Sequence, residues 1–104
     1  MHDFTFTMTA TDDSVVLAPR GELDFDTLPD IEEALTRLPD STGPVVLDMA
    51  GVPFMDLAGL RLACRLETGD LLRGRVVLAR GWRPQPEKLL RLAELPVTPG
   101  RIAL

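Results

Sequence analysis

The chain has 104 residues, a length that suits one domain built around a single hydrophobic core. Its formal net charge of −5 and pI near 4.7 argue against a nucleic-acid-binding protein, which would present a basic face to phosphate groups. Hydrophobic residues make up 45% of the chain, which argues against disorder, and no run of about 18 apolar residues predicts a membrane-spanning helix.

The amino-terminal sequence and the cysteine content predict a cytoplasmic protein. Residues 1–5 do not combine a basic segment with a following apolar one, so we expect no secretory signal. Cys64 is the single cysteine, and it cannot form an internal disulfide. A reducing compartment is therefore the simplest setting.

The first third of the chain predicts a β-hairpin followed by a helix. Phe4, Phe6 and Met8 alternate with threonines, a period of two that is typical of a strand with one buried face. After a turn, residues 15–18 are a short apolar run that predicts the second strand. Apolar residues then recur at helical spacing, at Leu28, Ile31, Leu35 and Leu38. Candidate caps for this helix are Asp24, Asp26 and Thr27.

The central stretch predicts a strand, a tight turn and a helix start. Residues 45–47 are an apolar run that indicates a buried strand. After the turn, we expect Phe54 and Met55 to return to the interior. Asp56 then stands where an N-cap is needed, at the start of a helix expected over about 57–72. Unpaired backbone N–H groups at such a helix start attract negative charge.

The last third predicts a strand, a loop and a short helix. Residues 76–79 indicate another buried strand, and residues 81–86 indicate a loop rich in glycine and proline. An amphipathic helix is expected over 87–95, with four residues facing inward: Leu89, Leu90, Leu92 and Ala93. Residues 97–104 predict an edge strand.

The order of these elements indicates an α/β protein with one domain. Strands separated by helices favour parallel pairing through right-handed crossovers, while the first two strands form an antiparallel pair. We therefore expect a mixed β-sheet of four to five strands packed with three or more α-helices.

Two motifs give the chain its resemblance to a known family. One is GELD at residues 21–24, and the other is FMDLAGL at residues 54–60, which contains Asp56, Gly59 and Leu60. Their spacing, with an amphipathic helix and an apolar strand between them, is similar to that of the STAS domain. This module occurs in bacterial anti-sigma factor antagonists and in the tails of sulfate transporters. The resemblance extends over nearly the whole chain and makes residues 1–104 a single STAS domain.

The resemblance to anti-sigma factor antagonists implies a mechanism of protein binding. The antagonist binds an anti-sigma factor of kinase fold and thereby frees a sigma factor. The anti-sigma factor uses ATP and magnesium to phosphorylate a serine directly after the motif aspartate, and this ends binding. A phosphoryl group adds a charge of about −1.5 to −2 at the docking surface. The antagonist is then a substrate and a switch, and we expect no catalytic residues, no cofactor and no metal of its own.

The chain departs from the family pattern at the position of the phosphoacceptor. Leu57 stands where the serine is expected, and Ala58 follows it, so neither side chain carries a hydroxyl. We therefore expect a STAS protein that phosphorylation at this position does not switch off. A binding-competent antagonist controlled by abundance and a divergent member with another partner both fit this substitution.

The predicted partner-binding residues are Asp24, Asp56, Leu57, Ala58 and Gly59. Each also has a purely structural interpretation at this stage. Asp56 and Asp24 suit helix or turn capping, and Gly59 suits a backbone requirement. Leu57 is either an exposed apolar contact or part of the core.

Two functions of other classes remain open from the sequence. One is a transport-associated STAS subunit that binds a transporter component or a small ligand, which also explains the missing serine. The other is an enzyme in which Asp24, Asp48 and Asp56 gather at one end of the sheet and hold Mg²⁺. The absence of a phosphate-cradling G-x-x-x-x-G-K motif argues against the enzyme.

Overall fold

A computed structural model describes residues 4–11, 13–38, 43–67, 72 and 75–93, and its elements follow the predicted order ββαβαβα. The strands are β1 (Thr5–Ala10), β2 (Val15–Arg20), β3 (Val45–Asp48) and β4 (Val77–Arg80). The helices are α1 (Leu28–Leu35), α2 (Leu57–Glu67) and α3 (Pro84–Ala93). No helix within these described ranges is both long enough and apolar enough to cross a membrane.

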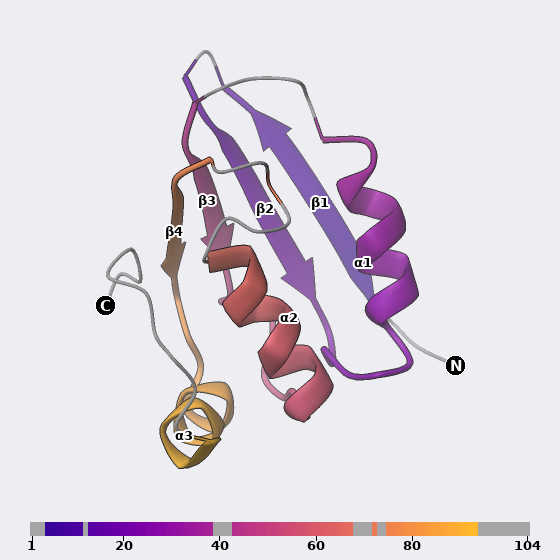
Figure 1. Ribbon diagram of the computed structural model, residues 1–104, viewed down its shortest axis with the longest axis vertical. Helices are drawn as coiled ribbons and strands as arrows, with labels where there is room; N and C mark the ends of the chain where they lie inside the picture. Colours follow the sequence, from indigo (N-terminus) through magenta and orange to yellow (C-terminus); the bar gives the residue numbers. More distant parts are fainter. Residues whose placement is uncertain (1–3, 12, 39–42, 68–71, 73–74, 94–104) are drawn as a thin grey trace.

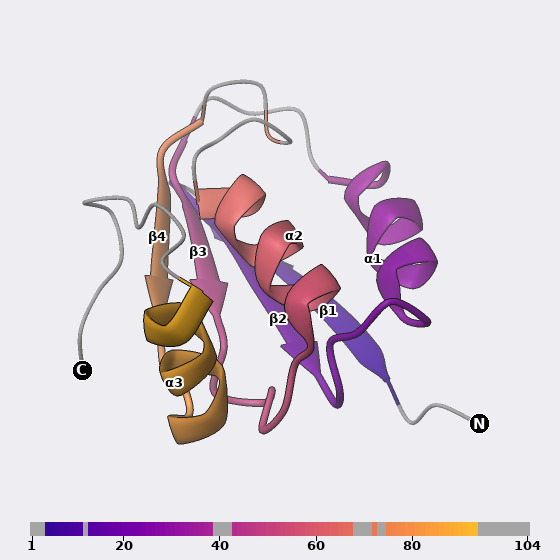
Figure 2. The ribbon, with the colours of Figure 1, turned by 60° about the horizontal axis from the view of Figure 1, so that its bottom comes forward.

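The four strands form one mixed sheet in the order β1-β2-β3-β4. β1 and β2 are antiparallel, as expected of the hairpin, and the β2–β3 and β3–β4 pairs are parallel. Helices α1 and α2 lie side by side over one face of the sheet, and α3 lies at the end where β3 and β4 finish (Figures 1 and 2). The parallel strands therefore deliver the starts of α2 and α3 to the same end of the molecule.

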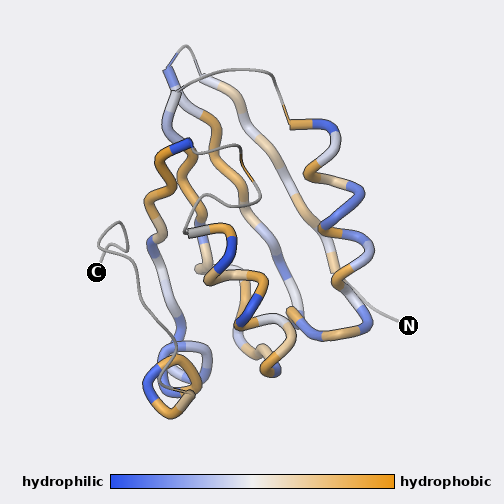
Figure 3. Tube along the Cα trace, in the orientation of Figure 1, coloured by the Kyte–Doolittle hydropathy of each residue, from blue (hydrophilic) through white to orange (hydrophobic). Residues whose placement is uncertain are grey.

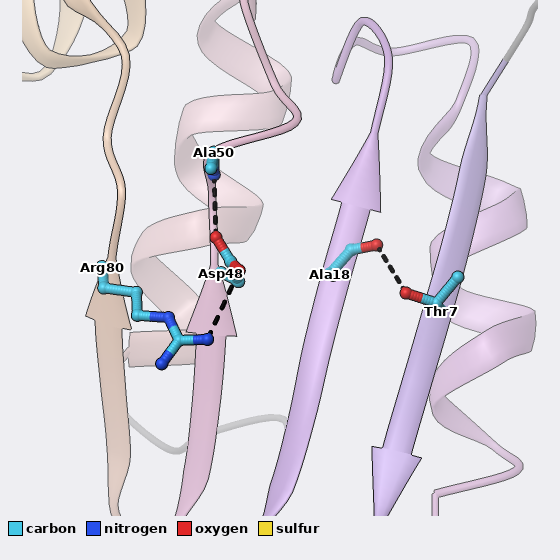
Figure 4. Close-up of polar contacts among 5 residues, drawn as sticks. All are labelled: Thr7, Ala18, Asp48, Ala50 and Arg80. Carbon is cyan, nitrogen blue, oxygen red and sulfur yellow. Dashed lines mark hydrogen bonds and ion pairs between the residues drawn. The ribbon is translucent and has the colours of Figure 1, made fainter.

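The core lies between the sheet and its helices. Leu17, Leu47 and Ala79 are paired in one row across three strands, and each is at most 1% exposed. Figure 3 shows the corresponding apolar colours along the middle of these strands, with hydrophilic colours along the outer side of α1. At the hairpin, the Thr7 hydroxyl donates a hydrogen bond of 3.3 Å to the Ala18 carbonyl oxygen (Figure 4). In the core, full burial of a leucine side chain such as Leu17 or Leu47 contributes about 1.5–3 kcal/mol.

Helix α3 corrects the predicted boundary between loop and helix. The helix begins at Pro84 rather than at residue 87, because proline suits the first helical position, where its missing N–H costs nothing. Pro86 and Leu90 are buried on one side of this helix. Leu92 follows Leu90 by two positions, about 200° around the helix, and is 71% exposed. The prediction that Leu92 faces inward was therefore wrong.

The segment before α2 corrects a second expectation. Met55 is fully buried, as predicted, but Phe54 is 44% exposed. Successive side chains in extended backbone point to opposite sides, so only one of the two residues can enter the core. Residues 68–71 of the predicted central helix and the expected edge strand over 97–104 lie outside the described residues.

Candidate functional site

The two sequence motifs lie side by side at the carboxyl ends of β2 and β3. The Leu23 backbone N–H donates to the Phe54 carbonyl oxygen at 3.1 Å, and the Asp56 N–H donates to the Leu23 carbonyl oxygen at 3.3 Å. Leu23 and Met55 thereby form an isolated parallel bridge. The GELD segment and the start of α2 are thus held together as one unit by backbone hydrogen bonds.

The Asp56 carboxylate joins helix α2 to the loop before α1. Its Oδ1 atom accepts a hydrogen bond of 2.9 Å from the Gly59 backbone N–H, which confirms the predicted helix cap. Its Oδ2 atom accepts a hydrogen bond of 3.2 Å from the Phe25 N–H. This second bond crosses 31 positions of the sequence, and the local capping pattern does not predict it.

Asp24 and Thr27 close the turn that leads into α1. Asp24 Oδ1 accepts a hydrogen bond from the Thr27 N–H at 3.1 Å, and Thr27 Oγ1 accepts one from the Asp24 N–H at 2.9 Å. Thr27 is fully buried, and its hydroxyl also lies 3.1 Å from the Glu22 carbonyl oxygen, to which it donates. Asp24 thus has the turn-closing role, one of the structural roles that the sequence left open, while Thr27 is the N-cap residue of α1 and makes no side-chain cap bond. The Asp24 side chain is half-buried.

Gly59 is required by the close approach of α2 to the GELD segment. Gly59 lies within α2, so its backbone conformation does not require glycine. A Cβ atom at this position would, however, collide with the carbonyl oxygen of Leu23. Gly21 has a different reason for being glycine. Its φ of 114° lies in the region that other residues avoid, and it allows the chain to turn out of β2.

Exposed apolar residues lie next to Asp56 in the chain and in the loop that its carboxylate binds. Leu57 is 51% exposed, so it is a surface residue and not part of the core. Phe25, whose N–H binds Asp56, is 72% exposed, and Phe54 is also exposed. These three are among the five large hydrophobic residues exposed in the described part of the chain. Such a concentration is typical of a surface that binds another molecule.

Gln85 supports the site from α3, and the sequence analysis missed it. Its Oε1 atom accepts a hydrogen bond from the Met55 N–H, and its Nε2 atom donates one to the Met55 carbonyl oxygen, both at 3.0 Å. The Gln85 side-chain amide thus bonds both backbone polar groups of Met55, as a residue of a neighbouring β-strand would. Because residues 81–86 read as a loop, nothing in the local sequence points to this contact.

Asp48 does not join the other two aspartates. Its Oδ1 atom accepts a hydrogen bond from the Ala50 N–H at 3.0 Å, and its Oδ2 atom lies 3.4 Å from Arg80 Nη2 (Figure 4). Over the ranges that the structure describes, no group of three or more acidic, histidine or cysteine side chains is placed to hold a metal ion. The arrangement of Asp24, Asp48 and Asp56 considered for Mg²⁺ is therefore not found.

Comparison with known proteins links this geometry to a family. A sequence model of the STAS domain matches residues 5–97. The structure is similar to that of an anti-sigma factor antagonist from Mycobacterium paratuberculosis, with 27% sequence identity, a TM-score of 0.66, and coverage of 93% of this chain and 86% of that chain. It shares its fold with the anti-sigma factor antagonist SpoIIAA in its unphosphorylated form, at 20% identity, a TM-score of 0.65, and coverage of 94% and 86%. None of the curated proteins compared matches the chain.

We expect Gly59→Ala to destabilise the fold, although alanine normally stabilises a helix relative to glycine. The added methyl group meets the Leu23 carbonyl oxygen, and the backbone must move to accept it. The free energy of unfolding, measured by urea denaturation, should fall by about 1–3 kcal/mol. Ala58→Gly exchanges the same two residue types at the neighbouring position and should cost about 1 kcal/mol from propensity alone. A Gly59→Ala protein more stable than the wild type would contradict the close approach.

Asp56→Ala should destabilise the protein by about 1–2 kcal/mol, because it removes the helix cap and the bond to the Phe25 N–H together. Hydrogen exchange should become faster at the amides of both Gly59 and Phe25. Asp56→Asn, which keeps one acceptor oxygen, should have a smaller effect. Asp13→Ala removes an exposed aspartate and should stay within about 0.5 kcal/mol. Unchanged exchange at Phe25 in Asp56→Ala would refute the role of Asp56 as a link between the two segments.

Gln85→Ala should leave the N–H and C=O groups of the buried Met55 without their partner. We expect a loss of about 1–3 kcal/mol in unfolding free energy and faster exchange of the Met55 amide. Gln85→Glu keeps the acceptor but cannot donate, so its loss should be intermediate. Lys88→Ala, at an exposed position of the same helix, is the matched control. If Met55 exchanges at the wild-type rate in Gln85→Ala, Gln85 does not support this segment.

Proposed function

The chain belongs to the STAS domain family, and we propose that it is a non-enzymatic protein-binding regulator of the anti-sigma factor antagonist type. In this role it binds an anti-sigma factor of kinase fold and frees a sigma factor. The similarity to the antagonist from Mycobacterium paratuberculosis supports the proposal. The observation that carries it is the exposed apolar surface around Asp56, formed by Phe25, Phe54 and Leu57.

This surface has the properties that a docking site needs. Its apolar side chains lose water on contact with a partner, and this supplies the driving force for association. Backbone hydrogen bonds and the Asp56 carboxylate fix the two segments that carry these side chains. Little conformational entropy is then lost on binding, which favours affinity. The Asp56 and Asp24 carboxylates add negative charge for basic groups of the partner.

We further propose that phosphorylation does not switch this site off. Leu57 and Ala58 offer no hydroxyl to a kinase. Thr27 lies in the same pair of loops, but its hydroxyl is buried and hydrogen-bonded. Ser14 precedes the start of β2, whereas the Asp56 surface follows the carboxyl ends of the parallel strands, so Ser14 lies at the opposite end of the sheet. Binding would then be controlled by the amount of the protein.

The test uses the kinase-fold anti-sigma factors encoded in the same genome. Each is titrated calorimetrically with the wild-type protein, and the one that binds is then incubated with it, ATP and Mg²⁺. Mass spectrometry should find no phosphate on the wild-type chain. The Leu57→Ser variant should become phosphorylated at the substituted position, because it restores a hydroxyl next to Asp56. Leu57→Ala shortens the side chain without adding a hydroxyl and should remain unmodified.

Two outcomes contradict the proposal. Phosphate on Ser14, Ser41 or Thr68 of the wild-type chain would show that the switch has moved to another residue. Binding to none of the kinase-fold proteins, together with capture of a membrane ATPase by the tagged protein in its own cells, would support the transport-associated alternative instead.

A further inference from the structure

An open groove of about 350 Å³ runs between α1 and α2, next to the Asp56 surface. Its apolar lining comes from Phe25 and Leu28 on the α1 side and from Ala58 and Leu62 on the α2 side. Of these, Leu62 is buried, Leu28 and Ala58 are half-buried, and Phe25 is exposed. The groove therefore shares Phe25 with the exposed apolar residues next to Asp56.

The two walls of the groove carry opposite charge. Arg61 and Arg65 line it on α2, and Glu32 lines it on α1; all three side chains are exposed. Among the residues that the structure describes, no hydrogen bond or ion pair engages the Arg61 guanidinium or the Glu32 carboxylate. In a protein of net charge −5, Arg61 places an exposed basic group on the α2 wall.

The shape of the groove suits a helix. On α2 the lining residues recur at 58, 61, 62 and 65 and form one stripe along the helix. The facing wall consists of Leu28 and Glu32 on α1 and Phe25 in the loop before it. At about 1.5 Å per residue, the stripe on α2 is about 10 Å long, or two helical turns. Figure 2 shows α1 and α2 running side by side over the sheet, with α3 on the far side of α2 from α1. A third helix can lay its apolar face between them in the helix-in-groove mode.

We propose that this groove receives an amphipathic helix of a protein partner. Its apolar residues contact Leu28, Ala58 and Leu62, and its acidic flank faces Arg61. Basic residues on its other flank face Glu32. The inference extends the proposed docking function, because it specifies what part of a partner lies beside the Asp56 surface.

The test titrates the full chain with synthetic peptides and needs no identified partner. The first peptide is an amphipathic helix with leucines at helical spacing, glutamates on one flank and lysines on the other. The second has the same leucines with lysines on both flanks, and the third has the first composition in scrambled order. We expect the first peptide to shift the NMR signals of the Ala58, Arg61 and Leu62 amides. It should bind about tenfold more tightly than the second, and the third should not bind.

Charge-reversal variants locate the contact. Arg61→Glu should weaken binding of the first peptide about tenfold, because it places a carboxylate against the glutamate flank. Lys88→Glu makes the same change of net charge on α3, outside the groove, and should leave the affinity within about twofold of the wild type. Both positions are exposed, so both variants should fold.

Several results would overturn the inference. These are the absence of shifts at the groove amides, equal binding of the lysine-flanked peptide, and equal weakening by Arg61→Glu and Lys88→Glu. If the wild-type chain dimerises and the Arg61→Glu variant does not, a second copy of the chain occupies the groove instead. The peptide result does not depend on any anti-sigma factor. The peptides can therefore bind even if no anti-sigma factor does, and an anti-sigma factor can bind even if the peptides do not. The two proposals thus fail separately.

Discussion

The carboxylate of Asp56 holds together the two segments from which the candidate site is built. One oxygen caps α2 through the Gly59 N–H, and the other accepts from the Phe25 N–H in the loop before α1. The direct backbone bonds of Leu23 to Phe54 and Asp56 bring these segments close enough for the contact with Phe25. Gly59 then allows α2 to pass the Leu23 carbonyl oxygen without collision. The geometry of the site depends on this small set of contacts.

The same contacts explain why the site can display apolar side chains without loss of order. Phe25, Phe54 and Leu57 are exposed, and exposure of large apolar groups stabilises no fold by itself. Their backbone is held by hydrogen bonds to neighbouring segments, including the pairing of Gln85 with Met55 from α3. The loop before α1, the start of α2 and helix α3 therefore together position the exposed apolar residues next to Asp56. The adjacent groove, with the basic group of Arg61 on its α2 wall, extends this surface along the helix layer.

Local sequence patterns predicted the elements because each pattern depends on near neighbours. The alternation from Phe4 to Met8 corresponds to β1, and the helical spacing from Leu28 to Leu38 corresponds to α1, which ends three residues earlier, at Leu35. The capping position of Asp56 was also predictable, because a cap binds an N–H only three residues away. Contacts between distant segments were not predictable in this way. The bonds from Asp56 to Phe25 and from Gln85 to Met55 span about thirty positions, and no local pattern encodes them. The exposure of Phe54 was not predictable either, because only one of the adjacent residues Phe54 and Met55 can pack in the core, and the local pattern does not say which.

The proposed absence of a phosphorylation switch is tested most directly by the lifetime of the complex with the kinase-fold anti-sigma factor. Dissociation of the purified complex is followed by biolayer interferometry with and without ATP and Mg²⁺. With Leu57 in the phosphoacceptor position, the dissociation rate should be governed by docking alone and should not rise as ATP is consumed. Release of the wild-type protein that requires hydrolysable ATP would contradict this account.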